Sequence, residues 1–286
     1  IIGIPIMMEN EVLYYRKDIF EEKGLSPPTN MEELEQIAAE LTDKENDFYG
    51  FVARGKGAAA VTQISTFLYN FGGEWLDADR NPIINQPEAV EAFDYYGRLL
   101  REYGPPGSTN NHWYEASSIL AQGQAAMYTD ANSLFSVVED PESSTVVGNI
   151  GYAMMPAGPA GNHPYVSVWG ISMASSSQNK EATWCLMQWL TSKDIVKEAQ
   201  MKGIPGGRRS VWADPDGASA FPADWVETFV ASNEIAYPYD RPPVVAVSEV
   251  RDAVGKVIVT SIEGGDVQAA ADEAAAEMAD IMSRTE

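Results

Sequence analysis

The chain has 286 residues, enough for one large domain or two ordinary ones, and its 45% apolar and 21% charged residues are typical of a globular protein. Its 19 basic and 42 acidic residues leave a formal net charge of -23, which disfavours nucleic acid and anionic membrane surfaces as partners. The single cysteine, Cys185, excludes a disulfide within the chain and a thiolate metal cluster.

The sequence opens on an apolar, strand-like run, "IIGIPIMM", without a polar lead-in. Such a run is typical of the inside of a domain, so we expect a fragment of a longer protein. The printed sequence contains no signal-peptide pattern, and its apolar runs are shorter than the roughly 18 residues of a membrane span.

The first half of the chain predicts two long helices. The segment 27–42 carries apolar residues at helical spacing on one face, and Thr29 with Glu32 has the spacing of a capping box. The segment 86–104 has the same periodicity and ends at Gly104, which a proline follows.

The second half predicts three more helices. The segment 179–203 has apolar residues at core spacing, Cys185 among them. A final pair spans 247–265 and 266–283, with two glycines between the helices and Asp266 as the cap of the second.

Short strand-like segments separate these helices. They lie at 1–5, 11–15, 49–53, 149–156 and 165–174. Strands that alternate with helices predict an α/β layered fold.

Motifs for catalysis or cofactor binding are absent or incomplete. The stretch "GFVARGKG" has the spacing of a phosphate-binding loop, but Gly57 replaces the hydroxyl that would bind magnesium, so we interpret it as a surface loop. His112 and His163 lack metal-site spacing, and no serine lies in a nucleophile elbow. We expect no metal and no cofactor, although 42 acids leave room for the paired carboxylates of a glycoside hydrolase.

Several aromatic residues lie in turn-like segments. Each one alone is more often a packing residue than a ligand contact. Together with the polar groups of the same loops, Arg241 included, they are the ingredients of a carbohydrate site, because an indole face covers the C–H side of a sugar and charged groups bind its hydroxyls. They are Trp75, Trp113, Trp169, Tyr237 and Tyr239.

Five stretches resemble, in the same order, the family 1 extracellular solute-binding proteins, which are the sugar receptors of ABC importers. The first is "GIPIMMENEVLYYRKDIFEEKGLSPPTNMEEL". The others are "FLYNFGGEWLD", "LAQGQAAMYTDANSLF", "VWGISMASSSQNKEATWCLMQWL" and "GIPGGRRSV". The segments "EYGPPGS" and "YDRPPVVAVSEVRDAVGKVI" are similar to the subgroup associated with sugar alcohols and small sugars.

This resemblance implies a two-lobed periplasmic-binding-protein-like fold (type II) of the α/β class, with ligand in the cleft and closure by hinge bending. It assigns 1–10 and 166–209 to the remainder of lobe 1, and 11–165 and 210–286 to lobe 2. Family members carry further residues upstream, so the resemblance implies that part of the N-terminal lobe is missing here.

The resemblance also implies ligand-binding residues. Glu9 follows the "GIP" strand where relatives have a sugar-binding glutamate, and Asp130 in "AMYTDAN" has a carboxylate for two adjacent hydroxyls. Trp169 takes the place of a stacking tryptophan, and Arg208 that of a loop arginine. The alternatives are a hinge salt bridge for Glu9 and Arg208, a helix cap for Asp130 and core packing for Trp169.

The run "FGGEWLD" is similar to the family's Gly-Gly turn in the second lobe. Gly72 and Gly73 permit a tight turn, and we expect Trp75 to pack beneath it. Thr62 and Gln63, near the start of the preceding helix, are better placed for the cleft. With Trp113 and Arg241 they complete the expected ligand site.

The expected function is that of a non-enzymatic, monomeric binding protein, periplasmic or extracellular, that delivers a sugar or sugar alcohol to the permease of an ABC importer. A lipid anchor is compatible with this expectation. A carbohydrate-active hydrolase and a vestigial fragment without a ligand remain as alternatives.

Overall fold

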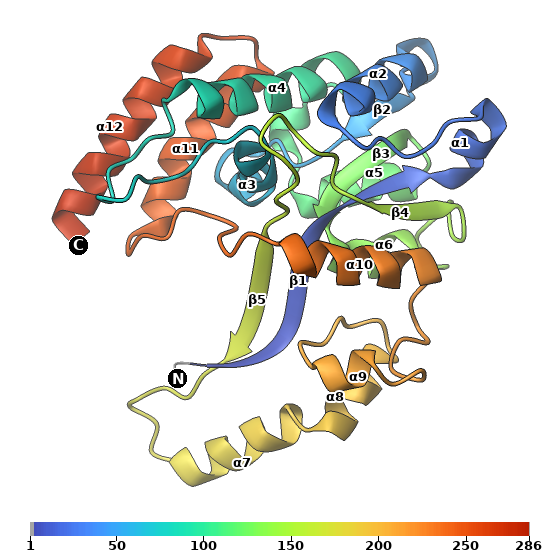
Figure 1. Ribbon diagram of the computed structural model, residues 1–286, viewed down its shortest axis with the longest axis vertical. Coiled ribbons are helices and arrows are strands. Elements are labelled where there is room, and N and C mark those ends of the chain that lie inside the picture. The colour runs from blue at the N-terminus through green and yellow to red at the C-terminus, as the bar shows by residue number, and fades with distance from the viewer. Residues whose placement is uncertain (1–2, 286) are drawn as a thin grey trace.

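The computed structural model describes residues 3–285 and shows a mixed α/β molecule built around a five-stranded sheet (Figure 1). The α/β prediction is confirmed. Ile1 and Ile2, which belong to the first predicted strand, lie outside the described residues. No helix within residues 3–285 has both the length and the apolarity that crossing a membrane requires.

Helices separate the strands up to β4, β5 follows β4 without a helix between them, and the elements after β5 are all helices. The strands are β1 (Ile4–Arg16), β2 (Tyr49–Val52), β3 (Ala125–Ala131), β4 (Ile150–Met154) and β5 (Val166–Ile171). The α-helices are α1 (Lys17–Lys23), α2 (Met31–Leu41), α3 (Val61–Asn70), α4 (Pro87–Tyr103), α5 (Trp113–Ala121), α6 (Phe135–Val138), α7 (Lys180–Leu190), α8 (Lys193–Gln200), α9 (Arg209–Trp212), α10 (Ala223–Ile235), α11 (Val247–Ile262) and α12 (Val267–Thr285). Short 3-10 turns are η1 (Lys44–Asn46), η2 (Gly57–Ala60), η3 (Ser108–Asn110) and η4 (Asn132–Leu134).

Strand β1 is shared between two parts of the sheet. Its second half lies between β3 and β4 in the order β2-β3-β1-β4, with Glu11 opposite Ala131. Its first half pairs antiparallel with β5, where Glu9 lies opposite Ser167. The strand therefore changes partners after Asn10, and two predicted strands are one continuous element.

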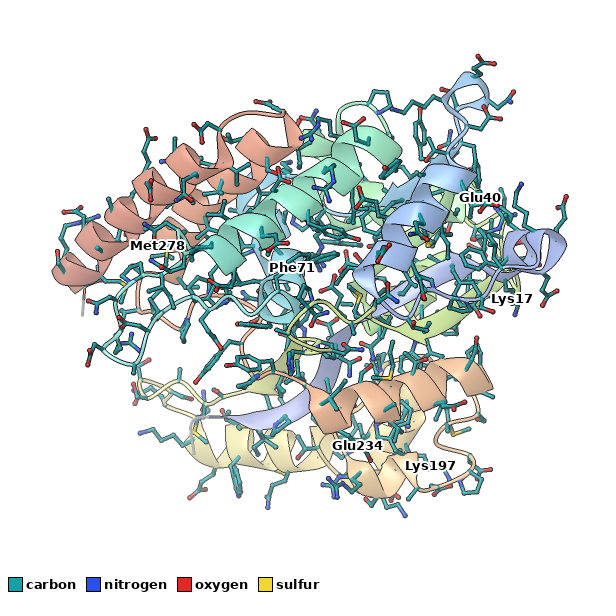
Figure 2. The ribbon with its side chains drawn as sticks, turned by 45° about the horizontal axis from the view of Figure 1, so that its top comes forward. Lys17, Glu40, Phe71, Lys197, Glu234 and Met278 are labelled. Atoms are coloured by element: carbon teal, nitrogen blue, oxygen red, sulfur yellow. The ribbon has the colours of Figure 1, made fainter. Side chains whose placement is uncertain are left out.

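Helices cover both faces of the sheet, and alternate residues of β1 reach different cores. Leu13 joins the larger core beneath α3, α4, α11 and α12, whereas Tyr14 faces the second core, which includes Trp225 of α10. In Figure 2, Phe71 and Met278 belong to the buried interior, and Glu40 lies on the solvent side of α2.

The predicted turn around the glycine pair is confirmed. Gly72 has a φ of 89°, in the left-handed region that favours glycine. A Cβ on Gly73 would lie 2.5 Å from Leu68 Cδ1. Trp75 is 2% exposed, so it packs beneath the turn as expected.

The N-terminal cap of helix α2 lies one residue later than predicted. The side chain of Asn30, not that of Thr29, caps α2 by accepting from Glu33 N at 2.9 Å. The Glu33 side chain, rather than that of Glu32, reaches back over this end of the helix, where its Oε2 accepts from Thr29 N at 2.7 Å. The predicted capping box is therefore wrong by one residue, because Asn and Thr are neighbours and both suit the position.

Two predictions on burial and continuity are wrong. The helix expected over 179–203 is interrupted after Leu190, and its apolar residues are largely exposed: Trp184 is 47%, Leu186 53% and Trp189 55% exposed. Cys185, expected in the core, is exposed as well. Figure 1 shows the reason: α7, α8 and α9 lie beyond the far end of β1 and β5, away from the main helical layer.

Candidate functional site

A cavity of about 450 Å³ lies where β1, β5, α3, the start of α5 and the segment around residue 240 meet. Five of the residues singled out from the sequence line it. They are Glu9, Thr62, Trp113, Trp169 and Arg241. Residues 160 positions apart thus share one wall, since the pairing of β1 with β5 brings Glu9 beside Trp169.

Glu9 is fixed by hydrogen bonds from both sides. Trp169 Nε1 donates to Glu9 Oε2 at 2.6 Å, and the Ser133 hydroxyl donates to Oε1. The indole of Trp169 remains 56% exposed. This end of the cavity therefore combines an oriented carboxylate with an open aromatic face.

Asp130 lies behind the cavity wall rather than in it. Its side chain is 0% exposed, and its carboxylate accepts from Arg54 Nε at 2.8 Å and from Arg54 Nη2 at 2.5 Å. Gln63 Nε2, Tyr128 OH and Ala131 N donate to the same carboxylate, each at 2.7 Å. Because these donors already occupy both oxygens, the expected direct contact of Asp130 with ligand hydroxyls does not fit the geometry.

Arg54, which Asp130 holds by two hydrogen bonds, lies between Asp130 and the cavity. It lines the cavity, and its side chain is only 13% exposed. Burial alone would lower the pKa of Arg54, but the charge and hydrogen bonds of Asp130 raise it above its ordinary value. Gln63, also 0% exposed, supports the same pair instead of lining the cavity.

Two more arginines, Arg241 and Arg251, line the cavity. Arg241 Nε donates to Asp240 Oδ2 at 2.8 Å, and this hydrogen bond raises the pKa of Arg241. Arg251 donates from Nε and Nη2 to Ala58 O, at 3.0 and 2.6 Å. Burial, together with the charge of Arg241, lowers the pKa of Arg251.

The charges of the site balance. Arg54, Arg241 and Arg251 face the cavity with Glu9 and Asp240, and Asp130 lies directly behind. The cavity thus offers several oriented donors and acceptors without an excess of either sign. Such a lining fits a neutral ligand rich in hydroxyl groups.

Sequence reasoning missed several lining residues, among them Arg54, His112, Tyr165 and Arg251. Arg54 belongs to the "GFVARGKG" stretch that was interpreted as a surface loop, yet it is largely buried. The available signal was an arginine directly after an apolar strand segment. Its partner Asp130 is 76 positions away, so no local pattern shows the pair.

Arg208 lies outside the cavity lining. Its Nη2 donates to Thr191 O at 2.6 Å, which ties the start of α9 to the end of α7. Arg208 thus joins two helix ends in the structure, and its expected ligand contact stays a prediction.

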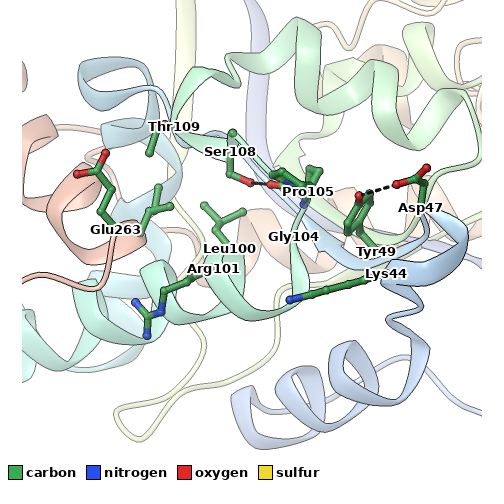
Figure 3. A pocket seen from close by; sticks show the side chains of 13 residues that line it. Lys44, Asp47, Tyr49, Leu100, Arg101, Gly104, Pro105, Ser108, Thr109 and Glu263 are labelled. Atoms are coloured by element: carbon green, nitrogen blue, oxygen red, sulfur yellow. Dashed lines mark hydrogen bonds between the residues drawn. The ribbon is translucent and has the colours of Figure 1, made fainter.

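A second cavity, of about 470 Å³, lies between the end of α4, the η3 turn and the end of α11 (Figure 3). Two hydrogen bonds join groups of its lining: Ser108 Oγ donates to Pro105 O, and Tyr49 OH donates to Asp47 Oδ1. It contains none of the residues expected to bind the ligand. Within residues 3–285, moreover, no group of three or more His, Cys, Asp or Glu side chains is arranged to hold a metal ion.

Residues 2–197 match the family model described as "Bacterial extracellular solute-binding protein". The chain is 30% identical over 228 residues to a mannitol-binding protein of Pseudomonas aeruginosa, a match that covers 76% of this chain and 52% of that protein. It is 30% identical over 260 residues to an erythritol/L-threitol-binding protein of Mycolicibacterium smegmatis, covering 87% of this chain and 52% of that one. The chain thus spans about half the length of these curated relatives.

Solved structures agree with the fold over nearly the whole chain. An ABC transporter solute-binding protein from Agrobacterium radiobacter in complex with ribitol has a TM-score of 0.89 and 34% identity, covering 98% of this chain and 71% of that chain. One from Agrobacterium vitis with bound D-mannitol has a TM-score of 0.87 and 27% identity, covering 99% and 73%. The predicted similarity to two-lobed solute-binding proteins is confirmed.

Proposed function

The chain belongs to the bacterial extracellular solute-binding proteins, and from this premise we propose that it binds a small sugar or sugar alcohol in the cavity beside β1. The observation that carries the proposal is the lining itself, in which Glu9, Arg54 and Trp169 offer an acceptor, a donor and an aromatic face to one space. Hydroxyl-rich ligands need this combination.

The proposed ligand is a neutral polyol or monosaccharide. The balanced charge of the lining supports this choice, since an anionic sugar would leave the site with an uncompensated charge. The names of the relatives support it too: one binds mannitol, one erythritol or L-threitol, and one solved structure holds ribitol.

We further propose the division into lobes given by the sequence, with 1–10 and 166–209 in one lobe and 11–165 and 210–286 in the other. The change of strand partner along β1 after Asn10 supports this boundary. A ligand that contacts both Glu9 and Arg54 would then touch both lobes. Contacts made only in the closed arrangement would stabilise closure. The protein would then act outside the cytoplasmic membrane as a monomer, deliver its ligand to an ABC permease and leave the ligand chemically unchanged.

Binding is tested by thermal shift and calorimetry with ribitol, D-mannitol, erythritol, glucose and maltose. A ligand at a hundred times its Kd adds about 2.7 kcal/mol of stability, which is readily detected. NMR of the recovered ligand after overnight incubation should show the starting compound. Conversion of the ligand would support a hydrolase instead, and no thermal shift from folded protein with any of these compounds would contradict the proposal.

A matched pair of variants tests the location. Trp113 lines the cavity, whereas the neighbouring Tyr114 is 61% exposed and lies outside the lining. Trp113→Ala should weaken binding about tenfold, in line with the loss of one aromatic contact. Tyr114→Ala removes only a ring contact with Trp113, at a centroid distance of 5.7 Å, and should weaken binding much less. Equal effects of the two variants would place the ligand elsewhere.

A further inference from the structure

His112 takes part both in the cavity wall and in the start of helix α5. Its ring lines the cavity, and it is the residue that precedes the first residue of α5, Trp113. His112 Nδ1 accepts from Trp113 N at 2.7 Å, and Glu115 Oε2 accepts from His112 N at 3.0 Å. This reciprocal pair fixes both the ring and the backbone from which Trp113 enters the cavity.

The hydrogen bond determines which nitrogen of the ring carries the proton. A nitrogen that accepts a hydrogen bond has no proton, so the proton of neutral His112 is on Nε2. Within residues 3–285, no acceptor is bonded to this Nε2–H. The group is therefore a donor without a protein partner on a residue of the cavity wall.

The surroundings of His112 favour its neutral form. Burial, with the charge of Arg54 and to a lesser extent that of Lys56, lowers the pKa of His112, whereas Glu115 and Asp130 act in the opposite direction. The positive end of the α5 dipole also opposes a cation at this position. A second proton would have to go to Nδ1, where it would face Trp113 N–H and break the bond between them.

We infer that neutral His112 is a positioning and specificity residue of the ligand cavity, which holds Trp113 in the wall through the helix cap and donates Nε2–H to a ligand oxygen. This inference rests on the proposed function, because it takes a hydroxyl-bearing ligand as its acceptor. It explains why a histidine stands where serine, threonine, asparagine or aspartate is the usual cap.

The expected consequence is a loss of affinity in acid. If only the neutral ring supports binding, the apparent Kd is constant above the pKa of His112 in the free protein and rises by about tenfold per pH unit below it. Because burial and the charge of Arg54 lower the pKa of His112 from its ordinary value of about 6.5, the loss of affinity should begin only below that ordinary value.

The test is calorimetric titration of the 286-residue chain with ribitol and D-mannitol between pH 8 and pH 5. His112→Asn keeps a side-chain acceptor for the cap and an N–H donor but does not titrate, so its Kd should vary less than about twofold over this range. His163, the other histidine, lies outside the cavity lining, and His163→Asn should keep the full pH dependence. A wild-type Kd that is constant with pH, or a His112→Asn variant with the wild-type dependence, would overturn the inference.

A second measurement needs no ligand. In His163→Asn, 15N NMR of the single remaining imidazole should show the Nε2–H tautomer at pH 7.5 and a titration midpoint below about 6.5. The Nδ1–H tautomer would refute the inference. If neither polyol binds at any pH, the proposed function fails, and NMR still decides the state of His112.

Discussion

Removing the carboxylate of Asp130 should destabilise the chain strongly, because it leaves a buried cation without its partner. Asp130 is 0% and Arg54 13% exposed, and hydrogen bonds of 2.8 and 2.5 Å join them. Breaking a buried ion pair by removing one partner costs about 3 to 5 kcal/mol. For a chain near this size, each kcal/mol lowers Tm by about 2 to 4 °C, so Asp130→Ala should lower Tm by roughly 6 to 20 °C.

Urea denaturation of four variants tests this reasoning. Asp94 forms an exposed pair with Arg98 at 2.9 Å, so Asp94→Ala should cost about 1 kcal/mol or less. Replacing both buried partners, in Asp130→Ala with Arg54→Met, should cost less than the sum of the single changes, since no unpaired charge then remains. A cost below about 1 kcal/mol for Asp130→Ala, or strictly additive single changes, would refute the reasoning.

Three further predictions concern other parts of the chain. Burial raises the pKa of Glu11, so the folded chain keeps a proton that the unfolded chain releases above about pH 4.5. The free energy of unfolding should therefore fall as the pH rises from there. Urea denaturation at pH 4.5 and 7.5 should show that Glu11→Gln removes this fall. A Cβ on Gly97 would lie 1.9 Å from Ser261 Oγ, so Gly97→Ala should push α4 away from α11. In the same assay it should lower the free energy of unfolding by about 1 to 3 kcal/mol. An unchanged free energy of unfolding would contradict this packing. Cys185 is exposed, so maleimide should label it fully without denaturant, whereas labelling only on unfolding would restore the buried interpretation.

Periodic helices were predictable, and so was the fold class. Helices α2 and α4 have one buried and one exposed face, so their apolar spacing identifies them within a few residues. Strand β3 was missed for the opposite reason. All residues of Ala125–Ala131 are buried, and a strand covered on both faces shows no alternation.

The burial of α7 could not be predicted from its own sequence. Spacing of apolar residues shows that a helix has an apolar face but not what lies against that face. In the described part of the chain, Trp184 and Trp189 remain about half exposed. The same limit applies to Arg54 and Asp130, whose pairing depends on strands β2 and β3 lying side by side.

The position of the cavity follows from the single strand β1. Glu9 belongs to the half that pairs with β5, and Glu11, two residues later, lies opposite Ala131 in the half that pairs with β3. The carboxylate of Glu9 and the Arg54–Asp130 pair are therefore held by different sheet partners yet line or support one cavity. In the proposed division into lobes, a ligand that bridges them contacts both lobes, and a small rotation near Asn10 would change the distance between its contacts. We expect binding and closure to be coupled for this reason, since only contacts that differ between the two arrangements shift their populations.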